Sequence, residues 1–468
     1  MKSKGIRLPH TLLLIYIMVV LTVVATWIIP GGEYQRVEKD GRTVPVAGSY
    51  ARVEGRPQGL DGLFVSPAKG FVAAALIIAI VFICGGAFNV IQKTGAITAV
   101  IHNLSLDFGQ NKALRLLFIP VTMIIFSLGG AIWGMCEETM PFILIFVPLA
   151  LSLGYDTIVG VALPFVGAAS GFAGAFFNPF TVGIAQGLAG LPLYSGLGYR
   201  LIVWAGGTAI AIAVVMRYAA RVRKDPKISP TYEDDLEKRR KLDVDKPVLE
   251  KVAVSGAHKR VLFVFAAGFA VMIFGILKFR WDIGPIAGVF LAIGIFSGIV
   301  GRLSGDEIGK AFVEGAKDMV SAALIIGTAR AILIVAQDGR IMDTILAGLA
   351  GAISQFHPLI SAQIMFLSQC VINFFVHSGT AQAALTMPIM SPLGELVGIT
   401  RQTSVFAFQL AEYINPILPT SGVTMGVLGL AGLRYEKWAK WLIPLMIAWV
   451  LFAALSLIPP VLFKWGPA

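Results

Sequence analysis

Two adjacent carboxylates, Glu137 and Glu138, lie between apolar runs at 114–132 and 141–154. A carboxylate inside a membrane is costly unless it is paired, solvated or protonated, so this position indicates a binding site. The pair could hold a proton, a sodium ion or the basic side chain of a substrate. The structural alternative is that the pair lies at the membrane surface or caps the helix that starts near residue 139, where acidic residues are favoured.

A second polar segment, residues 377–381, separates apolar runs at 358–376 and 382–397. Its hydroxyls could hold a substrate or a hydrated ion, and its histidine could carry a proton, although a structural histidine fits equally well. Irregular backbone at membrane depth is tolerated only where it is buried in protein or lines a wet cavity. We therefore interpret both polar segments as tips of re-entrant hairpins over 114–154 and 358–397, with Glu137, Glu138, Thr139, His377, Ser378, Gly379 and Thr380 at the tips.

Each predicted hairpin precedes an apolar helix with an internal Asn-Pro pair, within 156–190 and 402–434. Proline removes an amide donor and clashes with the preceding turn, so each helix should unwind there. Freed carbonyls and half-helix ends could then bind an ion or a charged group, with a simple proline kink as the alternative. The residues that could contribute are Asn178, Pro179, Thr181, Asn415, Pro416, Thr420 and Ser421.

Two further charges stand beside these features. Glu412 lies about one helical turn before Asn415, and could form another acidic wall of a cavity or pair with Arg330 or Lys317. Arg330 interrupts the apolar run 319–335, where a charge should face protein or water rather than lipid. Arg330 could bind a substrate carboxylate through two hydrogen bonds, or it could neutralise a glutamate.

The elements that must position these residues are membrane helices. The chain has 468 residues, of which 56% are hydrophobic and 14% charged, and its mean hydropathy is +0.79. Soluble proteins average about 25% charged residues, so the composition excludes a soluble enzyme, a secreted disulfide scaffold and a disordered chain. The net charge of +11 is concentrated at helix ends and in one loop, which favours a lipid bilayer rather than nucleic acid as the partner.

The pattern of charges also predicts the topology. Lys and Arg are concentrated in residues 217–260 and near the N-terminus, at Lys2, Lys4 and Arg7, so both segments should be cytoplasmic. With the hairpins counted as non-crossing, the C-terminus is external and the polar segment 31–66 lies outside. The nine predicted spans are 8–29, 68–92, 156–190, 196–217, 261–279, 283–301, 317–336, 402–434 and 439–463; hairpin arms that cross fully would raise the count to as many as thirteen.

An internal repeat divides the chain into two halves. Residues 64–78 (FVSPAKGFVAAALII) and 312–326 (FVEGAKDMVSAALII) agree at ten of fifteen positions. The predicted topology gives the two copies opposite orientations, which is the inverted repeat of secondary transporters. The predicted domains are an N-terminal helix and external loop (1–66), a first repeat (67–217), a cytoplasmic linker (218–260), two scaffold helices (261–301) and a second repeat (302–468).

Three stretches carry a resemblance to a known family. Residues 26–34 (TWIIPGGEY), the tip 136–141 (CEETMP) and the paired Asn-Pro breaks resemble the YfcC/DcuC-type carriers of the ion-transporter superfamily, over essentially the whole chain. The resemblance implies an all-α homodimer in a bacterial inner membrane, with a scaffold domain and a transport domain that moves by an elevator mechanism. Dicarboxylate carriers of the superfamily have Ser-Asn-Thr tips, whereas the tips here are 137–139 (EET) and 378–380 (SGT), which argues against carrying over sodium–dicarboxylate coupling.

These observations predict a secondary active transporter of a small charged metabolite. No nucleotide-binding motif, metal-ligand spacing or nucleophile–base arrangement appears, so we expect no cofactor other than a coupling proton or sodium ion, and no enzymatic activity. Three candidate acids against one intramembrane arginine favour a basic amino acid antiporter of the arginine/ornithine type. The alternative is a proton- or sodium-coupled carrier of C4-dicarboxylates or short carboxylates, in which the arginine binds the anion.

Overall fold

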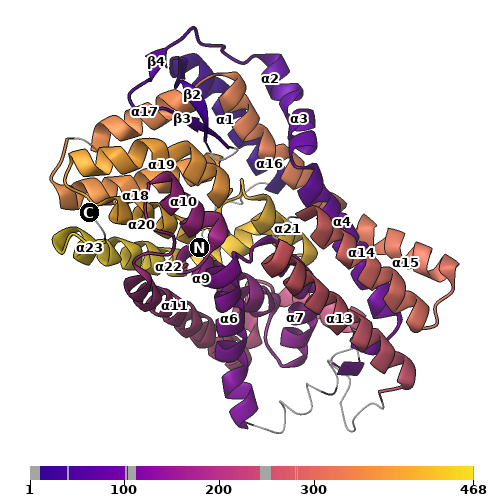
Figure 1. Cartoon of the computed structure of the whole chain (residues 1–468). Coiled ribbons are helices and arrows are strands. Elements are labelled where there is room, and N and C mark those ends of the chain that lie inside the picture. Colours follow the sequence, from indigo (N-terminus) through magenta and orange to yellow (C-terminus); the bar gives the residue numbers. More distant parts are fainter. Residues whose placement is uncertain are drawn as a thin grey trace, which may run out of the picture.

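The computed structural model is an assembly of helices with a few short strands at one end (Figure 1). It describes residues 11–39, 42–97, 99–100, 103, 112–242, 254–279, 281, 283–353 and 355–466. Lys2, Lys4 and Arg7, on which the predicted position of the N-terminus depends, and residues 243–253 of the predicted linker lie outside these ranges.

Five helical stretches among the described residues are long and apolar enough to cross a bilayer. They are α4 (Ala75–Lys93), α11 (Leu197–Lys224), α16 (Val320–Asp338), α18 (Pro358–Phe375) and the pair α22 (Tyr435–Ser456) and α23 (Ile458–Leu462). Outside the predicted hairpins, broken helices and polar insert, the described residues also form α1 (Thr11–Ile28), α2 (Leu60–Phe64), α3 (Ser66–Ala73), α13 (Gly256–Phe279), α14 (Ile283–Val300), α15 (Gly305–Lys317) and α17 (Met342–Ile353).

The segment 31–66 contains short strands, which the prediction of an all-α chain missed. β1 (Gly32–Glu33) pairs with β4 (Ala51–Arg52), and β2 (Arg36–Lys39) pairs with β3 (Arg42–Pro45), both antiparallel. The strands are too short to give a periodic hydrophobic signal. They are held to the second half of the chain instead, because Arg36 Nη2 donates to both oxygens of the buried Asp343 at 2.8 Å and the Tyr34 amide donates to Asp343 Oδ2 at 2.9 Å.

The two copies of the sequence repeat pack against each other. α3 lies against α16, and α4 lies against α15, so the beginning of each copy contacts the continuation of the other. The backbones come so close at Gly70 that an added Cβ would lie 2.2 Å from the Gly327 oxygen, and a Cβ on Gly315 would lie 2.2 Å from the Gly85 oxygen. Small residues are typical of such close contacts between membrane helices.

The predicted hairpins and broken helices are pairs of helices joined at the polar segments. In the first half, the predicted hairpin consists of α6 (Lys112–Trp133) and α7 (Met140–Ser152). The broken helix begins with α8 (Thr157–Val161) and α9 (Gly167–Ala173), joined by the π-helical residues Ala162–Val166, and continues after the break as α10 (Ile184–Leu188). In the second half, the predicted hairpin consists of α18 and α19 (Gly379–Leu396). The broken helix begins with α20 (Arg401–Leu410) and the 3-10 segment Ala411–Ile417, and continues after the break as α21 (Gly422–Leu430). The helices therefore end at or near the polar tips and the Asn-Pro pairs, where the sequence predicts that they end.

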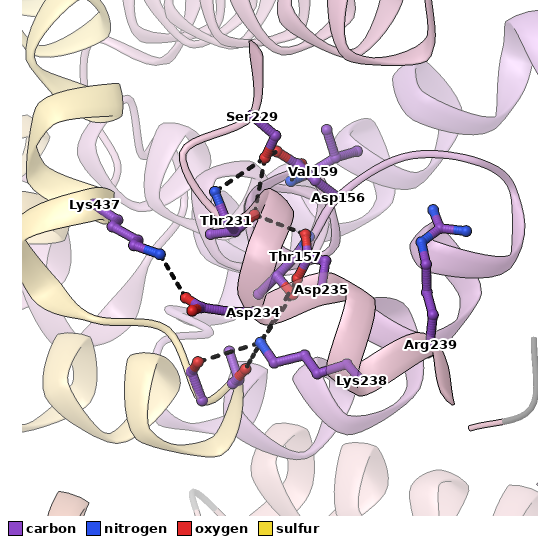
Figure 2. Close-up of polar contacts among 12 residues, drawn as sticks. Asp156, Thr157, Val159, Ser229, Thr231, Asp234, Asp235, Lys238, Arg239 and Lys437 are labelled. Atoms are coloured by element: carbon purple, nitrogen blue, oxygen red, sulfur yellow. Dashed lines mark hydrogen bonds and ion pairs between the residues drawn. The ribbon is translucent and has the colours of Figure 1, made fainter. Parts of the chain in front are cut away.

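A helix of the polar insert, α12 (Tyr232–Leu242), joins the two halves (Figure 2). Thr157, at the start of α8, donates its amide to Asp235 Oδ2 at 3.0 Å and its hydroxyl to Asp235 Oδ1. Lys238 Nζ donates to Thr157 Oγ1 at 2.9 Å and to the Ala431 and Gly432 oxygens, at 2.7 and 3.2 Å, just beyond α21.

A second ion pair extends this junction, because Lys437 Nζ of α22 lies 2.6 Å from Asp234 Oδ2. Burial lowers the pKa of the Lys238 ammonium, and the neighbouring Asp235 and Asp234 oppose that effect. We call this contact region of α12, α8 and the α21–α22 turn the α12 junction. It fixes the ends of two broken helices from different halves of the chain to one short helix.

Candidate functional site

The two tips and the two helix breaks meet in one place. Thr380 Oγ1, at the second tip, donates to the Phe180 oxygen of the first break at 2.9 Å. Asn415 Nδ2, at the second break, donates to the His377 oxygen of the second tip at 3.4 Å. Gly134, before the first tip, has a positive φ and lies so close to Asn178 that an added Cβ would be 2.7 Å from Asn178 Oδ1. Four segments far apart in the sequence therefore form one polar centre.

A cavity of about 350 Å³ lies at this centre. Eleven of the sixteen predicted site residues line it: Glu137, Glu138, Thr181, Arg330, His377, Ser378, Gly379, Thr380, Asn415, Thr420 and Ser421. Thr139, Asn178, Pro179, Glu412 and Pro416 do not line it. A cavity of this volume, with a few polar groups among apolar walls, is typical of a small-molecule site.

The acidic part of the wall is the first tip, a short 3-10 turn at Glu137–Thr139. Glu138 is 8% exposed, and its Oε2 accepts a hydrogen bond from the Cys136 amide at 2.9 Å. That bond fixes the Glu138 side chain over its own turn. Glu137 is half-buried and reaches the same cavity. Two carboxylates thus come from one turn, next to the start of α7.

The basic part of the wall is Arg330, which lies half-buried on α16. Among the described residues, none of the ion pairs includes Arg330, so its predicted pairing with Glu412 does not occur. Lys317, the other predicted partner of Glu412, is exposed on α15. Arg330 lines the same cavity as Glu137 and Glu138.

The hydroxyl groups at the two breaks have different roles. Ser421 caps α21 by accepting from the Thr424 amide at 3.3 Å. The buried Thr181 and Thr420 hydroxyls line the cavity without a protein partner among the described residues. Asn178 is fully buried and caps the turn after the first break, because its Oδ1 accepts from the amides of Phe180 at 2.9 Å and Thr181.

Glu412 faces a second, smaller space. A cavity of about 20 Å³ lies between the first tip and the second break, and Thr139, Glu412, Asn415 and Pro416 are among its walls. Asn415 lines both cavities. Glu412 stands one helical turn before Asn415, as the sequence predicts, because residues 411–417 form a 3-10 turn with three residues per turn, and Asn415 Nδ2 donates to Glu412 Oε2 at 3.2 Å.

Sequence reasoning missed the aromatic walls of the large cavity. Phe172 and Phe180 flank the first break, and Trp281 comes from the short connection between α13 and α14. A tryptophan in so short a connection between two apolar runs was a usable signal. Aromatic faces beside a cation-binding site attract ammonium and guanidinium groups. The site can thus hold a molecule that carries both a carboxylate and positive charge.

Comparison with known proteins supports the predicted relationship. The sequence pattern of the DcuC family, described as "C4-dicarboxylate anaerobic carrier", matches residues 8–461. The chain is 37% identical to "Putative basic amino acid antiporter YfcC" of Escherichia coli (strain K12), over 94% of each protein. It is 29% identical to an uncharacterised protein of Haemophilus influenzae over 98% of this chain and 97% of that protein. Among solved structures, the Alcanivorax borkumensis YdaH transporter is similar, with a TM-score of 0.44 and 15% identity over 98% of this chain and 100% of that one.

Proposed function

Since the chain belongs to the DcuC family of carriers and is a secondary transporter in a membrane, not an enzyme, we propose that it exchanges basic amino acids across a bacterial inner membrane. Arginine and ornithine are the expected pair. The name of the relative YfcC supports this substrate class, and so does the charge of the large cavity.

The observation that carries the proposal is the arrangement of one guanidinium and two carboxylates around the same cavity. A basic amino acid bears one carboxylate, one α-ammonium and one cationic side chain. Arg330 can bind the carboxylate through two parallel hydrogen bonds. Glu137 and Glu138 then face the two positive groups, and Phe172, Phe180 and Trp281 can contact the aliphatic chain and its cation.

Transport follows alternating access in this proposal. Residues 377–380 of the second tip and 137–138 of the first tip both line the cavity, so each tip can act as a gate in this scheme. The half-helices that end at the two breaks present polar backbone to the substrate, as in other transporters with broken helices. Movement of the hairpins and broken helices as one transport domain, against a scaffold in a homodimer, completes the elevator scheme.

A second candidate is transport of a C4-dicarboxylate. The family description names that substrate class, and Arg330 is the group that would bind it. In that case Glu137 or Glu138 would carry the coupling proton or sodium ion. The two candidates assign different roles to Glu137 and Glu138: the first has them contact the positive groups of the substrate, and the second has one of them hold the coupling ion.

The test is counterflow in proteoliposomes of the purified protein. Vesicles loaded with unlabelled ornithine should accumulate labelled arginine, whereas vesicles loaded with succinate should not accumulate labelled succinate. Counterflow of succinate without counterflow of arginine would overturn the proposal in favour of the dicarboxylate carrier. Glu314→Gln is the matched control for the acidic residues, because Glu314 is exposed on α15 away from the large cavity.

A further inference from the structure

Glu412 is a buried acid outside the substrate cavity. Its side chain is 1% exposed, and its Oε2 accepts from Asn415 Nδ2 at 3.2 Å. Its Oε1 has no hydrogen-bond partner among the described residues. This oxygen points toward the second tip, because a Cβ added to Gly379 would lie 3.1 Å from it.

No cationic side chain neutralises Glu412. It takes part in none of the ion pairs among the described residues. The titratable groups that face it are two thiols, Cys136 at the first tip and Cys370 on α18, and α18 also presents the Asn373 amide. A buried charge without a partner costs several kcal/mol, so the carboxylate must acquire a cation from solution.

The adjoining small cavity limits which cation this can be. A volume of about 20 Å³ has room for one water molecule. Beside Glu412 and Asn415 its walls are largely apolar, and the Thr139 hydroxyl already donates to the Cys136 oxygen at 2.6 Å. Metal cations of the hard class require a shell of several oxygen ligands, and among the side chains of these walls only those of Glu412, Asn415 and Thr139 carry oxygen. A proton needs only the carboxylate itself.

We propose that Glu412 is a proton-binding site, separate from the substrate cavity, through which the carrier, in addition to the exchange proposed above, couples one-way substrate movement to the movement of a proton. The proton passes from a hydronium ion to one carboxylate oxygen, so that one O–H bond forms as one hydronium O–H bond breaks and neutral water remains; release is the reverse step. Asn415 connects the two sites, because its side chain contacts Glu412 and the His377 oxygen and lines both cavities. This inference rests on the transport proposed above but not on the identity of the substrate.

Reconstituted protein with labelled arginine tests the coupling in sodium-free buffer. In the wild-type protein, an imposed pH gradient should change the rate of one-way arginine movement at least tenfold. Glu412→Gln should abolish that response, and counterflow at equal pH is measured alongside to establish that the variant still carries substrate. Glu412→Asp, which retains a carboxyl group, should keep part of the response.

Three results would overturn the inference. The first is a rate of one-way flux in the wild-type protein that does not change with the pH gradient. This result does not depend on the folding of any variant. The second is a pH response that survives in Glu412→Gln. The third is a response to a sodium gradient that disappears in Glu412→Gln, since it would assign sodium to this site. If arginine is not transported, succinate replaces it as the probe; the substrate proposal then fails while the proton inference is still decided.

Discussion

Replacing Lys238 by methionine tests whether α12 is fixed to both halves of the chain. The methionine keeps an apolar stem of similar length but removes the ammonium that donates to Thr157 Oγ1 and to the Ala431 and Gly432 oxygens. Hydrogen bonds from a charged donor contribute about 1.5–3 kcal/mol each. The Lys238 side chain is 23% exposed and burial disfavours its charge, so the net loss is smaller than the sum, about 2–3 kcal/mol.

That loss should appear as local opening of α12. A change of about 2–3 kcal/mol in opening free energy raises the exchange rate of the α12 amides roughly 30- to 150-fold. Hydrogen–deuterium exchange with mass spectrometry of the detergent-solubilised protein measures this directly. The exchange rate of α22 peptides near Lys437 should rise less, because the ion pair between Lys437 and Asp234 remains.

Lys241→Met is the matched control, since it changes the same residue type on the same helix. Lys241 forms only an exposed ion pair with Glu237 at 2.8 Å, with the two side chains 74% and 70% exposed. Solvent screens such exposed pairs, so they contribute little to stability and exchange should change far less than in Lys238→Met. Equal acceleration in the two variants, or none in Lys238→Met, would refute the α12 junction as a fixed contact.

Four further substitutions test the substrate cavity. Glu137→Gln and Glu138→Gln should abolish counterflow in at least one case, with the elution profile on gel filtration unchanged; full activity of both removes the pair from the mechanism. Arg330→Lys loses two-point binding of a carboxylate, so KM for arginine should rise at least tenfold while binding of the decarboxylated amine changes little; equal losses would indicate a structural role. Gly379→Ala places a Cβ 2.5 Å from the Thr181 methyl, so the second tip should not close and transport should fall at least tenfold, whereas wild-type rates would show that the tip adjusts.

Much of the helical framework could be predicted because its signals are local. The family assignment is confirmed, as is the mainly helical membrane architecture. The ends of α6, α7, α18 and α19 follow from long apolar runs that stop at charged, hydroxyl or glycine residues. Proline removes a backbone donor from a helix, so the interruptions at Asn178-Pro179 and Asn415-Pro416 could also be predicted from the sequence.

The features that sequence reasoning missed depend on contacts between distant segments. The sequence names Glu412 but not its surroundings: its Oε1 lies beside Gly379 of the second tip, a contact between two separate segments. β2 and β3 are short and polar, and what fixes them is Asp343, some three hundred residues away. Trp281 reaches the cavity because α13 and α14 pack beside it, and a linear pattern contains no such information.

The reciprocal packing of α3 with α16 and α4 with α15 affects how the chain is made. Gly85 leaves the ribosome roughly 230 residues before Gly315, the glycine it packs against. At about 5–20 residues per second, α4 waits roughly 10–50 s for its partner. Most of this surface can remain in lipid, because glycine and alanine expose neither charge nor an unmet hydrogen-bonding side chain to the acyl chains. The exception is the Asn89 amide of α4, which lacks its later partner, the Ala311 oxygen, until α15 is made. The same small residues that permit close packing in the finished protein thus let the first half persist unpaired during synthesis.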